Sequence, residues 1–184
     1  HSVKALLENG VQPDVLVLRT EHELSQDLRR KVALFCNVES DAVIQSIDVS
    51  TIYEVPNKMR EERLDEIVLR KMGLPLKDEP QLDDWNDFLN KLKKPKHEIE
   101  IGLVGKYVEL QDAYKSIIEA VIHAGAVNSC KVKVRLIHSE KITEENVAKK
   151  LEGLKGVIVA PGFGHRGIEG KIVATRYVRE NKIP

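Results

Sequence analysis

Apolar and polar positions along the second half of the chain predict three strands that alternate with helices. Apolar residues gather in runs of strand length at 99–104, 132–136 and 157–160. After each run, apolar residues recur at helical spacing, over 113–126, 143–151 and 168–178. Strand and helix in strict alternation are typical of a parallel sheet with right-handed crossovers, and they predict the start of a doubly wound domain.

The first half predicts the closing part of a second α/β sheet. Strand-like runs lie at 15–18 and 43–47, with helical patterns before, between and after them. The last pattern predicts one long charged helix over 57–72, which Gly73 ends. The fold class is therefore α/β, with two partial doubly wound (Rossmann-like or flavodoxin-like) parallel-sheet domains joined by a helical connector.

The connector is predicted at residues 74–97, between domains at 1–73 and 98–184. Pro75, Pro80 and the charged residues 77–79 precede an amphipathic helix that carries Trp85 and Phe88. Proline and charge on both sides of a lone helix are typical of an interdomain segment. Trp85 is expected to anchor this helix to a domain surface; stacking on a ligand is the less favoured alternative.

Composition narrows the function classes. The chain has 184 residues, and its 29 Lys and Arg balance 29 Asp and Glu. Zero net charge gives no electrostatic case for nucleic acid or an anionic membrane as partner. No run approaches the roughly 20 apolar residues of a membrane helix, and Lys4 interrupts the only signal-like segment. We expect a soluble, cytoplasmic protein, in which Cys36 and Cys130 are structural thiols rather than disulfide, metal or nucleophile positions.

The clearest candidate for chemistry is the turn at Pro161, Gly162, Phe163 and Gly164, between the last strand and the last helix. Such a turn lies at the carboxyl end of a parallel strand, where ligands bind. Glycine lets backbone N–H groups approach a ligand, and the helix N-terminus adds a positive dipole end. The turn therefore predicts an anion or oxyanion cradle. A plain strand-to-helix turn with positive φ is the alternative, because the spacing matches neither dinucleotide nor P-loop motifs.

The ends of the sequence suggest a piece of a longer polypeptide. There is no initiator Met, and His1 and Ser2 lead directly into a helical pattern. Ile183 and Pro184 follow the last helix as a further strand would.

Four segments together resemble the CTP synthase family. HSVKALLENGVQPDVLVLR and RRKVALFCNV resemble the last elements of its synthetase domain. GLVGKYVELQDAYKSIIEA resembles the opening of its glutaminase domain, and GVIVAPGFGHRGIEGKI resembles that domain's glutamine-binding turn. Each motif alone is weak, but the ordered set covers essentially the whole chain and is specific.

The resemblance implies a reaction and its partners. CTP synthases phosphorylate the uracil O4 of UTP with ATP and Mg²⁺, and ammonia then displaces the phosphate. A class I amidotransferase domain releases the ammonia from glutamine, GTP activates that step, CTP inhibits, and the active form is a homotetramer. The family's phosphate loop, magnesium carboxylates and Cys, His and Glu of the glutaminase match no residue here. No catalytic or metal-binding residue is therefore assigned, and the chain alone is expected to be inactive.

Binding residues carry over one by one. On the synthetase side, Lys31 matches the lysine that contacts the UTP or CTP triphosphate across a subunit interface; a solvated helix lysine is the alternative. Ile47, Asp48 and Val49 match the stretch that borders the ATP adenine, largely through backbone. Asp48 is also a candidate helix cap, and both roles are compatible.

On the glutaminase side, Gly162 matches the glycine whose N–H faces the glutamine carbonyl, and Phe163 lies beside it, near glutamine or GTP. Lys106 and Lys115 match lysines linked to GTP activation and domain coupling, with solvated lysines as the alternative. An ion pair or cap is the simple interpretation of Arg166 and Glu169 at the helix start.

One departure concerns the turn itself. The family usually has Pro-Gly-Gly-Phe-Gly, but here Pro161 stands in place of the first glycine. Proline has no N–H, so a contact through that amide is lost, whereas the donor at Gly162 survives.

Two other functions stay open at this stage. One is a non-catalytic, two-lobed α/β module that binds a small ligand or scaffolds an assembly. The other is a different class I amidotransferase, which would lack a UTP-binding first half. A Gly-x-Cys-x-Gly elbow within about ten residues after Pro184 would favour the enzyme, because class I glutaminases carry their thiol on such a turn.

Overall fold

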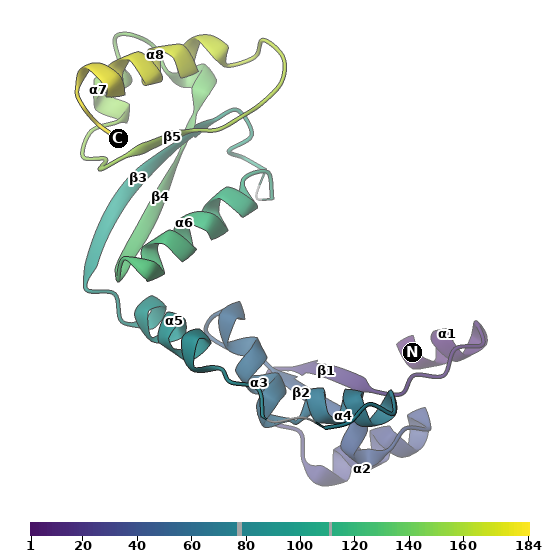
Figure 1. Cartoon of the computed structure of the whole chain (residues 1–184). Helices are drawn as coiled ribbons and strands as arrows, with labels where there is room; N and C mark the ends of the chain where they lie inside the picture. Colours follow the sequence, from purple (N-terminus) through teal and green to yellow (C-terminus); the bar gives the residue numbers. More distant parts are fainter. Residues whose placement is uncertain (77–78, 111) are drawn as a thin grey trace. The chain divides into compact units, whose positions relative to one another are not determined.

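The computed structural model describes residues 1–76, 79–110 and 112–184. Lys77 and Asp78 of the predicted connector, and Gln111 of the glutaminase-like opening, lie outside the described residues. The chain divides into two compact units, His1–Gln81 and Leu82–Pro184, which are described separately (Figure 1).

The first unit is built on two parallel strands. Strand β1 (Leu16–Thr20) pairs with β2 (Val43–Ile47) in a register that sets Leu16 opposite Val43 and Thr20 opposite Ile47. Parallel strands need a crossover, which helix α2 (Gln26–Cys36) supplies. The other elements of this unit are α1 (Ser2–Glu8), η1 (Ser40–Ala42), η2 (Ile52–Glu54), α3 (Val55–Glu61) and α4 (Leu64–Lys71).

Both faces of this small sheet are covered. Leu16 and Val43 pack on one face against Ala33 of α2. On the other face, Ile44 packs against Ile67 of α4. Adjacent residues of β2 therefore point to opposite cores, as in a doubly wound fold.

The predicted single helix at 57–72 is wrong, because α3 and α4 are separate helices. The break falls at Arg63, whose φ of 57° is left-handed. At the same bend, the Glu62 carboxylate accepts bonds from the Arg29 guanidinium of α2 and from the Gln45 N–H at 3.2 Å. Helical periodicity continues across the bend, so the sequence pattern could not reveal a break that tertiary contacts fix.

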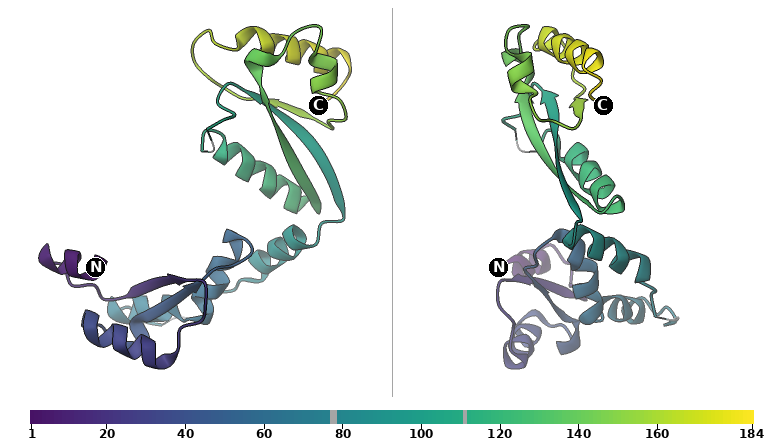
Figure 2. Two further views of the ribbon diagram at one scale, coloured as in Figure 1. Left: turned by 180° about the vertical axis from the view of Figure 1, so that it is seen from behind. Right: turned by 90° about the vertical axis from the view of Figure 1, so that its left-hand side faces the viewer.

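The second unit contains three parallel strands in the order β4–β3–β5. They are β3 (His97–Gly105), β4 (Cys130–His138) and β5 (Val157–Val159), and β3 and β4 run side by side over their length (Figures 1 and 2). The other elements are α5 (Asp83–Lys93), α6 (Lys115–Val127), η3 (Ser139–Lys141), α7 (Val147–Lys150) and α8 (Ile168–Glu180).

Here too the helices cover both faces. Leu103 packs on the α6 side with Tyr114 and Ala160. Val104, the next residue, packs on the opposite side with Ala174 of α8. The predicted α/β class with two parallel sheets is confirmed by these two units.

Helix α5 lies within the predicted connector range and belongs to the second unit. The Phe88 ring packs edge-on against His123 of α6 at 5.8 Å, and the Trp85 ring lies 5.5 Å from Phe88. The aromatic side chains thus dock this helix on α6, while the domain boundaries at 73 and 97 stay predictions.

Two further observations concern the last residue and the length of the helices. The Pro184 carbonyl accepts a bond from the Val157 N–H at 2.7 Å, so the last residue lies beside β5. Over the part of the chain that the structure describes, no helix is long and apolar enough to cross a membrane.

Candidate functional site

The candidate site lies at the carboxyl ends of β3 and β5. After β3 the chain turns to α6 on one face of the sheet, and after β5 it turns to α8 on the other. Loops that diverge to opposite faces leave a crevice at this switch point, which is where open parallel sheets bind ligands. The topology therefore brings together Lys106, just after β3, and the turn that starts at Pro161.

Lys106 is buried against that turn. Its side chain is 5% exposed, and its Nζ donates to the carbonyl oxygen of Phe163. The ammonium also lies 5.1 Å from the centre of the Tyr107 ring. A buried ammonium must be partnered to offset its lost hydration, and here the partner is the backbone of the predicted glutamine turn. The solvated-lysine alternative for Lys106 is therefore wrong, while its part in GTP activation stays a prediction.

The structure gives a different reason for glycine at 162. Positive φ occurs at Gly164 (78°) and Gly167 (76°), but not at Gly162. A Cβ added to Gly162 would lie 3.0 Å from Lys106 Cε and 3.5 Å from Lys171 Nζ. The positive φ expected of this turn is therefore found at Gly164, whereas at Gly162 two nearby lysine side chains leave little room for a Cβ.

The two remaining residues predicted for the glutaminase side are open to solvent. The Phe163 side chain is 97% exposed, although its carbonyl is held by Lys106. Lys115 is exposed at the first position of α6, after the carboxyl end of β3. Both residues are accessible to a ligand at this edge of the sheet.

Two contributors to the site were missed by the sequence. Tyr114 is 5% exposed, and its hydroxyl accepts bonds from the N–H groups of Lys106 (3.0 Å) and Tyr107 (3.2 Å). Lys171 of α8 donates from Nζ to the Ala160 carbonyl at 2.8 Å. In the sequence both lie in ordinary helical patterns, and the pattern of apolar positions does not predict either contact.

At the start of α8, the ion pair expected of Arg166 is present, with Glu140 of η3 as its partner. Arg166 Nη1 lies 3.1 Å from Glu140 Oε1 of η3, and its guanidinium carbon lies 5.4 Å from the centre of the Tyr107 ring. The loop before α8 is thereby tied to the ends of β3 and β4.

In the first unit, Ile47, Asp48 and Val49 lie at the carboxyl end of β2. The Asp48 N–H donates to the Thr20 carbonyl at 2.9 Å, and its carboxylate pairs with Arg19 at 3.1 Å. The stretch is thus placed at the edge where such sheets bind ligands. The cap expected of Asp48 is wrong, because Thr51 caps η2 instead, accepting from the Tyr53 N–H.

Lys31 is exposed on α2, on a face that is not simply polar. Leu34 and Phe35, three and four residues on, are 80% and 84% exposed. Arg29, two residues before Lys31, is instead mostly buried in an ion pair with Glu62. Its guanidinium holds the pKa of Glu62 below its ordinary value. Unlike Arg29, Lys31 is therefore presented on an exposed face together with large apolar side chains.

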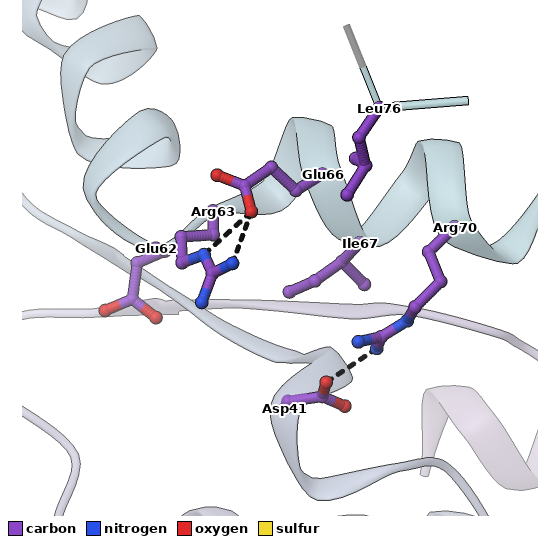
Figure 3. Close-up of a pocket in the computed structure, with 7 residues that line it drawn as sticks. All are labelled: Asp41, Glu62, Arg63, Glu66, Ile67, Arg70 and Leu76. Atoms are coloured by element: carbon purple, nitrogen blue, oxygen red, sulfur yellow. Dashed lines mark hydrogen bonds and ion pairs between the residues drawn. The ribbon is translucent and has the colours of Figure 1, made fainter. Parts of the chain in front are cut away.

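A hollow of about 170 Å³ lies elsewhere in the first unit. Figure 3 shows Arg63 directed at Glu66 and Arg70 directed at Asp41 within it. These guanidinium groups lower the pKa values of the two carboxyls, so these four charges of the lining form two ion pairs. Its lining includes none of the residues predicted to bind a ligand, and it is best described as an ion-pair cluster.

Cysteines and metal ligands add no chemistry among the described residues. Cys36 and Cys130 are free thiols, half-buried rather than fully buried. Over residues 1–76, 79–110 and 112–184, no group of three or more His, Cys, Asp and Glu side chains could hold a metal ion.

Comparison with known proteins assigns both units. Residues 1–74 match the family described as CTP synthase N-terminus, and residues 109–184 match glutamine amidotransferase class-I. Over all 184 residues the chain is 66% identical to a CTP synthase of Flavobacterium johnsoniae and 63% identical to one of Flavobacterium psychrophilum. The chain belongs to the CTP synthase family. It is also 57% identical to a CTP synthase of Bacteroides fragilis, and it spans 34% of the length of each of these relatives.

The two matches fall in the order expected of the CTP synthase family. One lies within the first unit and the other within the second. The match at 1–74 decides against an amidotransferase without a CTP-synthase-like first half.

Proposed function

We propose that this chain is part of an enzyme that converts UTP to CTP, using ATP and ammonia released from glutamine. The observation that carries the proposal is the pairing of a CTP synthase N-terminal match with a class I amidotransferase match in one chain. The topology supports it, since the Gly162 turn lies at the switch point of the second sheet and the buried Lys106 holds it there.

For glutamine hydrolysis, this chain supplies binding and orientation. Cleavage of the amide passes through a tetrahedral oxyanion, which a fixed backbone N–H stabilises more than it stabilises the substrate. Gly162 can offer such an N–H because no Cβ blocks the approach. Phe163, which is exposed beside Gly162, contacts glutamine or GTP. GTP acts as activator, and Lys106 and Lys115 are linked to that activation.

For the synthetase reaction, Lys31 binds the triphosphate of UTP, or of CTP as inhibitor, as a compact charge suited to phosphate oxygens. Ile47, Asp48 and Val49 border the ATP adenine. ATP enters with Mg²⁺, but the described residues include no cluster of carboxylates fit to hold the ion, so no step is assigned to it here. The exposed Leu34 and Phe35 beside Lys31 support a subunit contact on this face, in a cytoplasmic homotetramer.

The decisive experiment replaces Gly162 by Val in the full-length enzyme. The added side chain crowds Lys106 and Lys171 and displaces the turn, so glutamine-dependent CTP formation should fall by about 10²–10³-fold, the usual loss for one oxyanion donor. CTP formation from free ammonia should be nearly unchanged, because ammonia bypasses the glutaminase domain.

Gly153→Val is the matched control. Gly153 also lies in a turn of the second unit, with φ of 79° and no atom within 4 Å of an added Cβ. It places the same side chain in a turn of the same unit and strains the backbone there without crowding Lys106 or Lys171. It should spare the ratio of the two activities. Intact glutamine-dependent activity in the Gly162 variant would reduce the turn to a structural connector, and loss of both activities in a folded variant would contradict the assigned division of labour.

A further inference from the structure

Lysine side chains hold the turn after β5 at both of its ends. The Ala160 N–H still belongs to the sheet, donating to the Val104 carbonyl at 2.9 Å. Pro161 has no N–H to donate. At the start of the turn, Lys171 Nζ donates to the Ala160 carbonyl at 2.8 Å, and at its end Lys106 Nζ donates to the Phe163 carbonyl.

The two ammonium groups converge on Gly162 from different elements. Lys106 follows β3, whereas Lys171 lies in the first turn of α8. The site of a Cβ on Gly162 is 3.5 Å from Lys171 Nζ and 3.7 Å from Lys106 Nζ. Gly162 therefore lies against both charges, between two carbonyls that are held by lysines from different elements.

Holding Lys171 in this bond costs side-chain conformational entropy, which indicates that the position of its acceptor matters. The side chain is half-buried and gives up rotamer freedom to reach a carbonyl eleven residues earlier in the sequence. A bond from a charged donor is shorter and stronger than one between neutral groups, so it holds its acceptor in a narrower range of positions.

We propose that Lys171 is a positioning residue for glutamine hydrolysis. Together with Lys106 it clamps Ala160–Phe163, so that the Gly162 N–H keeps one direction while the oxyanion forms. The reason is that electrostatic stabilisation of a transition state requires donors that need not reorganise during the reaction. This inference rests on the proposed function for the rate effect, whereas the clamp itself is a property of the fold.

The test is Lys171→Met in the full-length enzyme, which keeps an unbranched stem and removes the ammonium. A misplacement of about 1 Å in such a site can cost about 10²-fold, so kcat/KM for glutamine should fall by about 10–100-fold. Ammonia-dependent CTP formation should stay within about twofold of the unmodified enzyme. Lys171→Arg, which keeps a charged donor, should restore most of the loss.

Arg179→Met is the matched control, on the same helix with an exposed side chain. It removes one cation without touching the turn, and should leave both activities unchanged. Unchanged glutamine kinetics in Lys171→Met, or an equal loss of both activities, would overturn the positioning role.

Hydrogen exchange separates this inference from the proposed function. In Lys171→Met, amides of residues 162–166 should exchange faster than in the unmodified protein, with no change in Arg179→Met. If the unmodified enzyme made no CTP from glutamine, the proposed function would fail, yet faster exchange at the turn would still support the clamp. Unchanged exchange there would overturn the clamp whatever the activity.

Discussion

At the scale of single residues, the glycines around the turn meet two distinct physical demands. Gly164 and Gly167 adopt positive φ, which an L side chain disfavours. Gly162 has no such φ, and a Cβ there would press against the Lys106 side chain, 3.0 Å from its Cε. Substitutions at these positions therefore act differently: a side chain at 164 strains the backbone, whereas one at 162 displaces charged groups at the site.

Lys31 provides a test at the same scale. In the full-length enzyme, Lys31→Ala should weaken UTP binding and CTP inhibition together, because one charge serves both triphosphates. A charge-assisted contact of this kind is worth about 1–3 kcal/mol, or roughly 5- to 150-fold in affinity. The measurements are the UTP dependence of the rate and the CTP concentration that halves it.

The neighbouring Arg30 offers the control for that prediction. Arg30 is 72% exposed and lies 3.6 Å from Asp27, so Arg30→Ala removes an equal charge from the same helix. Arg30→Ala should change neither the UTP dependence of the rate nor the inhibition by CTP. If Lys31→Ala also leaves UTP dependence unchanged, Lys31 is only a solvated lysine.

At the scale of elements, the site depends on how tightly α8 packs on η3. A Cβ on Gly170, in the first turn of α8, would lie 1.8 Å from the Ser139 carbonyl oxygen. The helix can approach η3 this closely only because residue 170 is glycine. This contact fixes how close α8 lies to η3. It therefore also determines whether the Lys171 side chain can bond to the Ala160 carbonyl.

Gly170→Ala should therefore destabilise the second unit. Alanine favours a helix over glycine by about 1 kcal/mol, but a clash with backbone cannot be relieved by a rotamer change. Overpacking typically costs about 1–3 kcal/mol, so we expect a net loss and a lower melting temperature. Thr175→Ala, on the exposed face of the same helix, should stay within about 0.5 kcal/mol. Equal melting curves for the two variants would show that α8 can shift without cost.

At the scale of the whole molecule, the chain carries two family matches on two separate units. Within the second unit, Cys130 lies away from the turn where glutamine is proposed to bind. Cys36 ends α2 in the first unit, and Cys130 begins β4, at the amino end of a strand of nine residues. At about 3.3 Å per residue, Cys130 is some 25–30 Å from the carboxyl edge of its sheet. The Cys130 thiol is therefore too far away to serve as the nucleophile for a substrate held at Gly162.

The 184-residue chain alone should therefore catalyse nothing. Glutamine hydrolysis needs an activated thiol at the site, and ATP-dependent CTP formation needs a phosphate loop that no residue here matches. Assays of the purified chain for glutamate release and for CTP should both read at background. Turnover of either kind that survives further purification would contradict the assignment of roles.

The sequence by itself determined the strands, most helices and the position of the candidate turn. Runs at 132–136 and 157–160 fall in β4 and β5, because alternation and apolar runs report local burial directly. Tertiary structure decided the bend at Arg63 and the lysine contacts to the turn. The bond from Lys171 Nζ to the Ala160 carbonyl forms only because the folded chain brings a helix next to the end of a strand. The periodicity of the sequence does not predict such a contact. The local pattern of apolar residues thus determined which strands and turn form the candidate site. Tertiary packing alone determined which side chains hold the turn in place.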